Sequence, residues 1–109
     1  MSALETAEEI IVKLSRAEKA QLLRWAANDL SEAFPGIESR PGVCGGEPCI
    51  VRTRIPVWVL EQARRLGVSE GELLRSYPTL RAEDLVNAWA YVRSHRDEIT
   101  QQIAANEAE

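Results

Sequence analysis

Apolar residues recur at helical spacing through the first third of the chain. Five of them stand three or four positions apart and so share one face of a helix: Leu23, Ala26, Ala27, Leu30 and Phe34. Ser15 is followed three residues later by Glu18, a capping-box pattern that predicts a helix beginning at about Arg16. Pro35 ends this run. A shorter amphipathic helix is predicted ahead of it, over residues 4–13.

Short pairs of β-forming residues replace the helical pattern between residues 43 and 51. Val43–Cys44 and Cys49–Val51 flank the dipeptide Gly45–Gly46, which is typical of a tight turn, and together they predict a short β-ribbon or hairpin. Residues 35–42 hold two proline–glycine dipeptides and are interpreted as a linker. Because an isolated hairpin is rarely stable, the ribbon is predicted to pair with its twin across the two-fold axis of a homodimer. The residues assigned to this dimer ribbon are Val43, Cys44, Gly45, Gly46, Cys49 and Ile50.

Helical signals return at Pro56. A proline suits the first position of a helix, and Gly67 is placed to end that helix in the left-handed conformation. Ser69 and Glu72 form a second capping-box pattern, which predicts a short helix ending near Ser76. Two successive helices with a turn after each are therefore expected between the ribbon and the last helix.

A last helix is predicted to start at Arg81 or Ala82 and to be long. Glu83 and Asp84 fall in its first turn, where carboxylates offset the helix dipole. Its apolar residues recur close to every fourth and seventh position: Leu85, Ala88, Trp89, Val92, Ile99 and Ile103. This stripe predicts that the helix continues past the compact domain as an exposed amphipathic extension.

These elements predict a mostly α fold in three parts. Residues 1–39 form an N-terminal helical arm, residues 40–96 form the ribbon and a three-helix unit of helix-turn-helix type, and residues 97–109 form an acidic amphipathic extension. Two helices joined by a short turn, the second with polar residues at its amino end, fit a helix-turn-helix. The same outline occurs in three-helix units that bind no DNA, so the spacing leaves both interpretations open.

The net charge of −4 is an average over three unlike regions. Residues 1–39 carry four basic and seven acidic side chains, residues 40–96 carry nine arginines and six acidic side chains, and residues 97–109 carry four acidic side chains and no basic one. A basic central domain can bind DNA within an acidic chain, because affinity for phosphate depends on local charge. Arginine also makes bidentate contacts with phosphate and guanine. The alternative is a solvated surface with scattered salt bridges.

The sequence disfavours an enzyme. A chain of 109 residues has room for one core but not for a deep substrate cavity, and its only histidine, His95, is interpreted as a surface residue. No metal-ligand cluster, phosphate-cradling loop or nucleophile with a base is found, so we predict no catalytic residue, metal, cofactor or small-molecule substrate. No apolar run approaches the ~18 residues of a membrane span, and the amino terminus lacks a secretory signal. A cytoplasmic protein without membrane contact is expected.

The cysteines and tryptophans each allow two interpretations. Cys44 and Cys49 supply half a tetrahedral metal site at best, and we expect them to pack as small apolar strand residues. Trp89 lies in register with the apolar stripe of the last helix and is expected in the core. Trp25 and Trp58 either belong to the core or anchor an interface, and the sequence leaves this open.

Four segments occur in an order that resembles the bacterial family catalogued as domain of unknown function 433. They are PGVCGGEPCI at residues 41–50, TRIPVW at 53–58, LLRSYPTL at 73–80 and EDLVNAWAY at 83–91, and the resemblance spans roughly residues 42–92. Two positions depart from the family pattern. Arg52 stands where the family usually has glycine, and Arg81 stands where it favours a serine or threonine cap, so that Thr79 is an alternative cap.

The resemblance implies a VapB-like antitoxin with a homeodomain-like or winged helix-turn-helix fold, encoded beside a PIN-like nuclease toxin. A homodimer would then bind operator DNA and the acidic terminal helix would bind the toxin. The expected DNA contacts are Arg52, Thr53, Arg54, Arg75, Thr79 and Arg81, and the expected partner contacts are Trp89, Arg96, Ile99 and Ile103. Arg54 also has an alternative role in an internal salt bridge. The alternative functions are a protein-interaction adaptor without DNA binding and a stand-alone transcriptional regulator.

Overall fold

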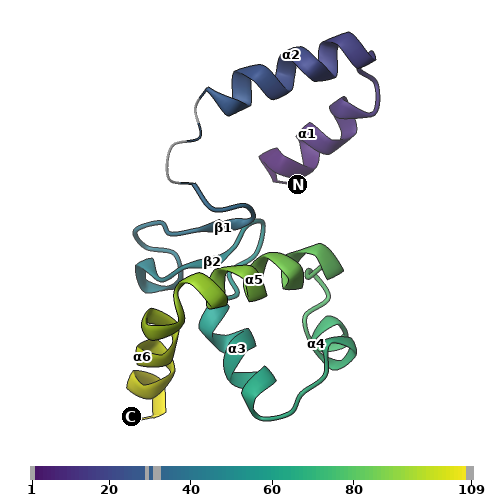
Figure 1. Ribbon diagram of the computed structural model, residues 1–109. Helices are drawn as coiled ribbons and strands as arrows, with labels where there is room; N and C mark the ends of the chain where they lie inside the picture. Colours follow the sequence, from purple (N-terminus) through teal and green to yellow (C-terminus); the bar gives the residue numbers. More distant parts are fainter. Residues whose placement is uncertain (1, 29, 31–32, 108–109) are drawn as a thin grey trace. The chain divides into compact units, whose positions relative to one another are not determined.

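The computed structural model describes residues 2–28, 30 and 33–107 and divides the chain into two compact units, residues 1–33 and 34–109. The elements that it describes follow one another as α1 (Ala3–Ile11), α2 (Arg16–Ala27), β1 (Ile37–Glu38), η1 (Cys44–Gly46), β2 (Cys49–Ile50), α3 (Val57–Arg65), α4 (Glu70–Ser76), α5 (Ala82–Ser94) and α6 (Arg96–Glu107) (Figure 1). The predicted fold class, mostly helical with one short pair of strands, is confirmed. No helix in the described part of the chain has the length and apolar character needed to cross a membrane.

The first unit, called the arm from here on, consists of α1 and α2. Ser15 caps α2 as predicted, because its hydroxyl accepts from the Glu18 backbone N–H at 3.1 Å and the Glu18 carboxylate accepts from the Ser15 N–H at 2.9 Å. Ser2 and Glu5 form the same box at the start of α1. The prediction that α2 runs to Phe34 is wrong, since α2 ends at Ala27, and Phe34 belongs to the second unit.

The predicted hairpin is also corrected. β2 pairs with β1 in antiparallel register, Ile37 opposite Ile50 and Glu38 opposite Cys49, and not with Val43–Cys44. Cys44 has a φ of 51° and starts a 3₁₀ turn, so this segment cannot continue an extended strand. The glycine turn itself is present, with positive φ at both Gly45 and Gly46. Residues 35–39, interpreted as linker and arm, are therefore part of the second unit.

The core of the second unit lies between α3, α5 and α6, with β1 against α5 (Figure 1). Gly67 ends the turn after α3 at a φ of 94°, as predicted, and the Ser69 hydroxyl accepts from the Glu72 N–H at the start of α4. The buried apolar residues of the core are Ile37, Ile50, Val57, Leu60, Leu73, Leu80, Leu85, Ala88, Trp89, Tyr91, Val92, Ile99 and Ile103. The predicted extension, residues 97–109, thus folds back onto the domain as far as residue 107, and residues 108–109 lie outside the described part of the chain.

The long last helix predicted from the apolar stripe is two helices, α5 and α6, with a break at His95. The His95 ring stacks on Tyr91 with centroids 3.9 Å apart and planes 3° from parallel, and Phe34 packs edge-on against Tyr91 at 5.2 Å. The Tyr91 hydroxyl donates to Glu98 across the break at 3.1 Å. His95 is therefore a packed aromatic residue at a helix junction, not the simple surface residue expected. Burial, with a contribution from Glu98, raises the pKa of Tyr91 to about 12.

Candidate functional site

The candidate site lies where the turn between α4 and α5 meets the loop after β2 (residues 51–56). α5 begins directly after Arg81, whose backbone N–H donates to the Asp84 carboxylate at 2.8 Å. This carboxylate satisfies one of the amide groups left open at a helix start. The alternative cap, Thr79, is not used, because the N-terminal cap position of α5 is Arg81. The two helices and their short turn keep the order of a helix-turn-helix.

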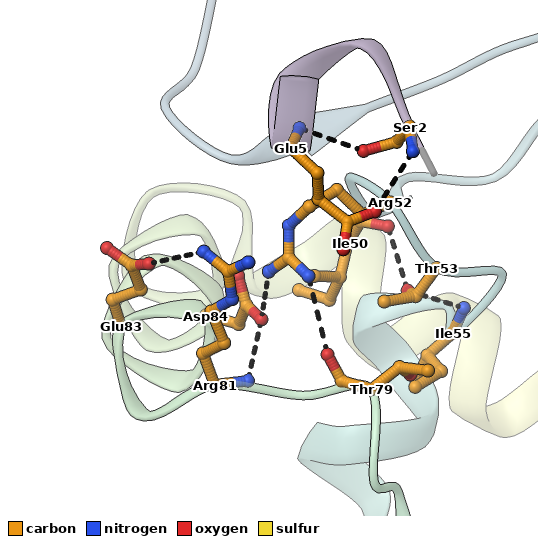
Figure 2. A network of polar contacts seen from close by, with 10 residues as sticks. All are labelled: Ser2, Glu5, Ile50, Arg52, Thr53, Ile55, Thr79, Arg81, Glu83 and Asp84. Atoms are coloured by element: carbon orange, nitrogen blue, oxygen red, sulfur yellow. Dashed lines mark hydrogen bonds and ion pairs between the residues drawn. The ribbon is translucent and has the colours of Figure 1, made fainter. Parts of the chain in front are cut away.

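Asp84 also holds Arg52, the first of the expected DNA contacts. Its carboxylate accepts from Nη2 of Arg52 at 2.6 Å, and the side chains are only 4% and 7% exposed (Figure 2). Nη1 of Arg52 donates to the Thr79 carbonyl at 3.4 Å. Arg52 is thus a buried link between the loop after β2 and the start of α5, whereas its expected role as a DNA contact requires a guanidinium at the surface.

The backbone at Arg52 explains why a glycine suits this position. Its φ is 67°, in the left-handed region that glycine adopts without strain and other residues adopt at a cost. This chain accepts the conformational cost at Arg52 and gains the ion pair with Asp84. The arginine at this position is therefore a structural feature of the fold.

The two threonines of the expected DNA set are placed differently. The Thr53 hydroxyl donates to the Ile50 carbonyl at 2.8 Å and accepts from the Ile55 N–H at 3.1 Å (Figure 2). It therefore holds the tight turn that leads into α3. Thr79 is exposed, and its carbonyl oxygen is the acceptor for Arg52. Thr79 thus keeps a free surface position, whereas Thr53 is used by the fold.

Three arginines of the expected set stay at the surface. Arg54 and Arg75 are exposed, and neither makes an ion pair with a described residue, so the internal salt bridge considered for Arg54 does not form there. Arg81 is partly exposed and lies 3.6 Å from the Glu83 carboxylate (Figure 2). Arg54 precedes α3, Arg75 lies in the last turn of α4, and Arg81 precedes α5.

Other arginines of the central region serve the fold. Arg64 and Arg65 both bind Glu61, at 2.7 and 2.8 Å, and Glu61 is only 4% exposed. Arg64 also lies over the Trp89 ring at 4.3 Å, and Arg40 pairs with Glu38 at 3.4 Å. The salt-bridge interpretation therefore holds for Arg40, Arg52, Arg64, Arg65 and Arg81, and the surface is less basic than the charge count indicates.

The exposed face of α5 has a mixed character. Glu83 lies in the first turn, Val86 is 63% exposed, and Arg93 lies in the last turn. Base recognition needs hydrogen-bond donors and acceptors that reach base edges. On this helix one apolar side chain stands between the acidic start and the basic end, so the stronger candidates for DNA contact are Arg54, Arg75 and Arg81 around it.

Three of the four expected partner contacts lie inside the domain. Ile99 is fully buried, Ile103 is 5% exposed, and Trp89 is 8% exposed under Arg64. Ile99 and Ile103 were expected on an exposed extension, but α6 packs on α3 and both are covered, whereas the burial of Trp89 on α5 agrees with its expected place in the core. Arg96 is exposed at the start of α6 and is the one member of this set at the surface.

The fold-back of α6 creates a feature that the sequence did not indicate. A shallow groove of about 190 Å³ lies between α3 and α6, lined by Gln62, Arg65, Leu66, Thr100, Ile103, Ala104 and Glu107. Leu66 is 77% exposed at this groove. Because α3 and α6 are more than thirty residues apart, the only sequence signal was an apolar residue directly before Gly67.

The expected dimer ribbon is not available for pairing between chains. On one side β2 is hydrogen-bonded to β1. On its other side Cys49 forms an isolated antiparallel β-bridge with Pro56, and the Ile50 N–H donates to the Ile55 carbonyl. Both edges of β2 are therefore satisfied within the chain. Val43, Gly45 and Gly46 lie in a turn beside it. The residues predicted to form a dimer ribbon instead build the second unit.

The two cysteines are free thiols in this fold. Cys49 is fully buried, and burial raises its pKa to about 11, with the neighbouring Cys44 thiol adding to the shift. The Cys44 thiol donates to the Arg54 carbonyl at 3.2 Å. Both cysteines were expected to pack as small apolar residues, and Cys49 does so. Among the residues described here, no three His, Cys, Asp or Glu side chains gather closely enough to bind a metal ion.

Comparisons with known proteins agree with these elements. The family model described as "Protein of unknown function (DUF433)" matches residues 37–92, from β1 into α5. The crystal structure of a DUF433 member protein from Anabaena variabilis ATCC 29413 is similar, with 38% sequence identity and a TM-score of 0.65, over 95% of this chain and 99% of that chain. That similarity extends beyond the matched family segment into the arm. No curated protein matches the chain.

Proposed function

This chain belongs to the DUF433 family, and from that premise we propose that it is the antitoxin of a type II toxin–antitoxin module. It acts without catalysis. It neutralises a PIN-like nuclease by direct binding, and it represses its own promoter through α4 and α5. The two activities use different surfaces of the second unit, and each surface is supported by separate observations.

The groove between α3 and α6 supports the toxin-binding activity and is the observation on which the proposal rests. Leu66, 77% exposed, offers an apolar contact beside the groove, and an apolar spot rimmed by polar groups is typical of a protein interaction site. α6 carries three acidic residues, Asp97, Glu98 and Glu107, against one basic residue, Arg96, so the helix is acidic, and Glu107 lines the groove together with Arg65 of α3. A nuclease presents basic residues to RNA, and an acidic face complements them.

Co-expression with the nuclease encoded beside this chain tests the binding activity. Leu66→Glu is expected to lose capture of the nuclease and rescue of growth, because it places a charge at the centre of the contact. Val86→Glu is the matched control, since Val86 is 63% exposed on α5, and it should keep both. Failure of the wild-type chain to capture or neutralise any such nuclease would contradict the antitoxin function and favour a stand-alone regulator.

Three surface arginines support the DNA-binding activity. Arg54, Arg75 and Arg81 flank the starts of α3 and α5 and the end of α4, where a helix-turn-helix meets the phosphate backbone. Arg81 is partly engaged with Glu83, so Arg54 and Arg75 are the stronger contacts. Phosphate contacts set the register, and specificity requires a dimer that reads two half-sites.

Affinity for the chain's own promoter, measured against salt concentration, tests this second activity. Replacing Arg54 and Arg75 together by Gln should lower the slope of log affinity against log salt by about four, because the dimer loses two phosphate contacts from each chain and each contact contributes about 0.9. Arg96→Gln on α6 should leave the slope unchanged. A wild-type chain with no salt-dependent retention of promoter DNA would exclude this activity and leave the adaptor function.

A further inference from the structure

Exposed apolar side chains are concentrated in the arm. Nine large hydrophobic side chains are exposed among the described residues, and seven belong to the arm, which has less than a third of the chain: Leu4, Ile10, Ile11, Val12, Leu23, Trp25 and Leu30. The second unit contributes Leu66 and Val86. Soluble proteins rarely leave so much apolar surface together unless it meets a partner.

The arm is nevertheless built from well-formed helices. Both α1 and α2 begin with a complete capping box, formed by Ser2 with Glu5 and by Ser15 with Glu18. The helices have 9 and 12 residues, and neither buries a residue. Isolated helices of this length are marginal in water, and most helical stability in proteins comes from packing an apolar face. These two helices therefore require a packing partner.

The apolar residues of α1 share a face, and on α2 a second apolar face holds Leu23 and Ala27, with Trp25 on the other side of the helix. Leu4 and Ile11 lie seven residues apart on α1, with Ala7 between them at three- and four-residue spacing. On α2, Leu23 and Ala27 lie four residues apart. This spacing is typical of helices that pack in a bundle with their axes nearly aligned, whether they run in the same or in opposite directions. The faces are suited to other helices, not to a small molecule.

The charges of the two helices are opposite. α1 carries Glu5, Glu8 and Glu9 and no basic residue. α2 carries three basic residues and one acidic residue: Arg16, Lys19, Arg24 and Glu18. Opposite charges beside an apolar contact determine which helices become neighbours. An acidic helix and a basic helix on one arm make that arm complementary to a copy of itself.

We propose that the arm docks onto the arm of a second copy of this chain to form an antiparallel four-helix bundle. Around the bundle, α1 and α2 of one chain are followed by α1 and α2 of the other chain. Every helix therefore has a neighbour of opposite charge on both sides. A two-fold axis produces this arrangement, because an isologous interface uses the same surface on both chains. The bundle covers the apolar faces of all four helices.

This interface does not depend on the proposed function. It replaces the predicted ribbon pairing, whose strand edges are already bonded within the chain. A dimer through the arm would also hold two second units together, as reading two half-sites requires. Loss of the dimer and loss of toxin binding are separable, because the arm and the groove at Leu66 share no residue.

Mixing two charge-reversed variants tests the pairing of arms. Glu8→Lys with Glu9→Lys makes α1 basic in one variant, and Lys19→Glu with Arg24→Glu makes α2 acidic in the other. Each alone should dimerise at least tenfold more weakly than the wild type in sedimentation velocity at moderate salt, because like charges then face each other. An equimolar mixture should restore the dimer, since each variant supplies the charge the other needs. Two monomers in the mixture would overturn the proposal.

A pair of leucine substitutions tests the apolar part of the interface. Leu23→Glu, at a side chain 70% exposed on α2, should give a monomer. Leu66→Glu, at a side chain 77% exposed in the second unit, should stay dimeric. A wild-type chain that is monomeric at high micromolar concentration would overturn the proposal, as would a dimer that Leu23→Glu does not weaken. A monomer whose arm is covered only when a nuclease is added would assign the surface to that partner instead.

Discussion

The arm and the second unit contain helices of similar length, yet these helices are stabilised in different ways. α3, α5 and α6 bury their apolar residues against one another, whereas α1 and α2 bury none. The capping is as complete in the arm as anywhere in the chain, so the difference does not arise at the helix ends. Local signals decide where a helix begins, and the partner of its apolar face decides whether the chain alone can stabilise it.

The largest effect is expected at the buried ion pair of the second unit. Asp84→Asn leaves the Arg52 guanidinium buried without its counter-charge, so the free energy of unfolding should fall by about 3–5 kcal/mol in urea denaturation. Glu83→Gln is the matched control, because Glu83 is exposed and its pairing with Arg81 is a surface interaction of about 0–1 kcal/mol. Equal effects at the two positions would mean that the pair with Arg52 does not hold the fold.

Two isoleucine truncations compare the regions directly. Ile99→Ala removes a fully buried side chain between α6 and the core and should cost about 2–5 kcal/mol in the unfolding of the second unit. Ile10→Ala acts on a side chain 52% exposed on α1 and should leave that transition unchanged while weakening self-association. Thermal unfolding and sedimentation of both variants distinguish these results. An Ile99→Ala variant as stable as the wild type would contradict the packing of α6.

Alkaline pH should weaken the second unit. Tyr91 has a pKa of about 12 in the folded chain against an ordinary value of 10, so the folded state holds its proton longer than the unfolded state. Stability from this group is therefore present below pH 10 and is lost between pH 10 and 12, on the order of 2 kcal/mol. Cys49, with its pKa raised to about 11, should begin the loss above pH 9. Tyr91→Phe should remove the later part of this loss, and an unchanged pH profile in that variant would be evidence against it.

The smallest effect is expected at the start of α2. Ser15→Ala removes a capping hydroxyl and should cost α2 about 1 kcal/mol. Circular dichroism should show less helix than in the wild type, and this deficit should become larger as the protein is diluted. Urea unfolding of the second unit should not change. A shift of that unfolding transition would show that the arm and the second unit are stabilised together.

Short-range signals predicted much of this fold. The helix starts after Ser15 and Ser69 and the end marked by Gly67 are confirmed, because each depends on residues within one turn of the helix. The same reasoning could have found the box of Ser2 and Glu5, which has an identical spacing. The exposed Arg54 and Arg75 also remain where a surface contact needs them.

Long-range contacts account for what the sequence did not predict. Arg52 binds Asp84 thirty-two residues away, and no local pattern indicates such a pair. The break at His95 has no glycine or proline, and the His95 ring stacks there on Tyr91. No local signal marked this break, so the apolar stripe was interpreted as one helix. The groove at Leu66 exists only because that break returns α6 to α3. Each of these features depends on which part of the chain packs against which distant part, and a local sequence pattern does not contain that information.

Hydrogen exchange at two protein concentrations tests the contrast between the regions most directly. The backbone amides of α3, α5 and α6 should be protected to the same extent at both concentrations, because their partners lie within the chain. The amides of α1 and α2 should be exchanged rapidly in dilute protein and protected in concentrated protein, because a second copy completes their packing. Equal protection of the arm at both concentrations would contradict this account, since the arm would then be stabilised by its own chain.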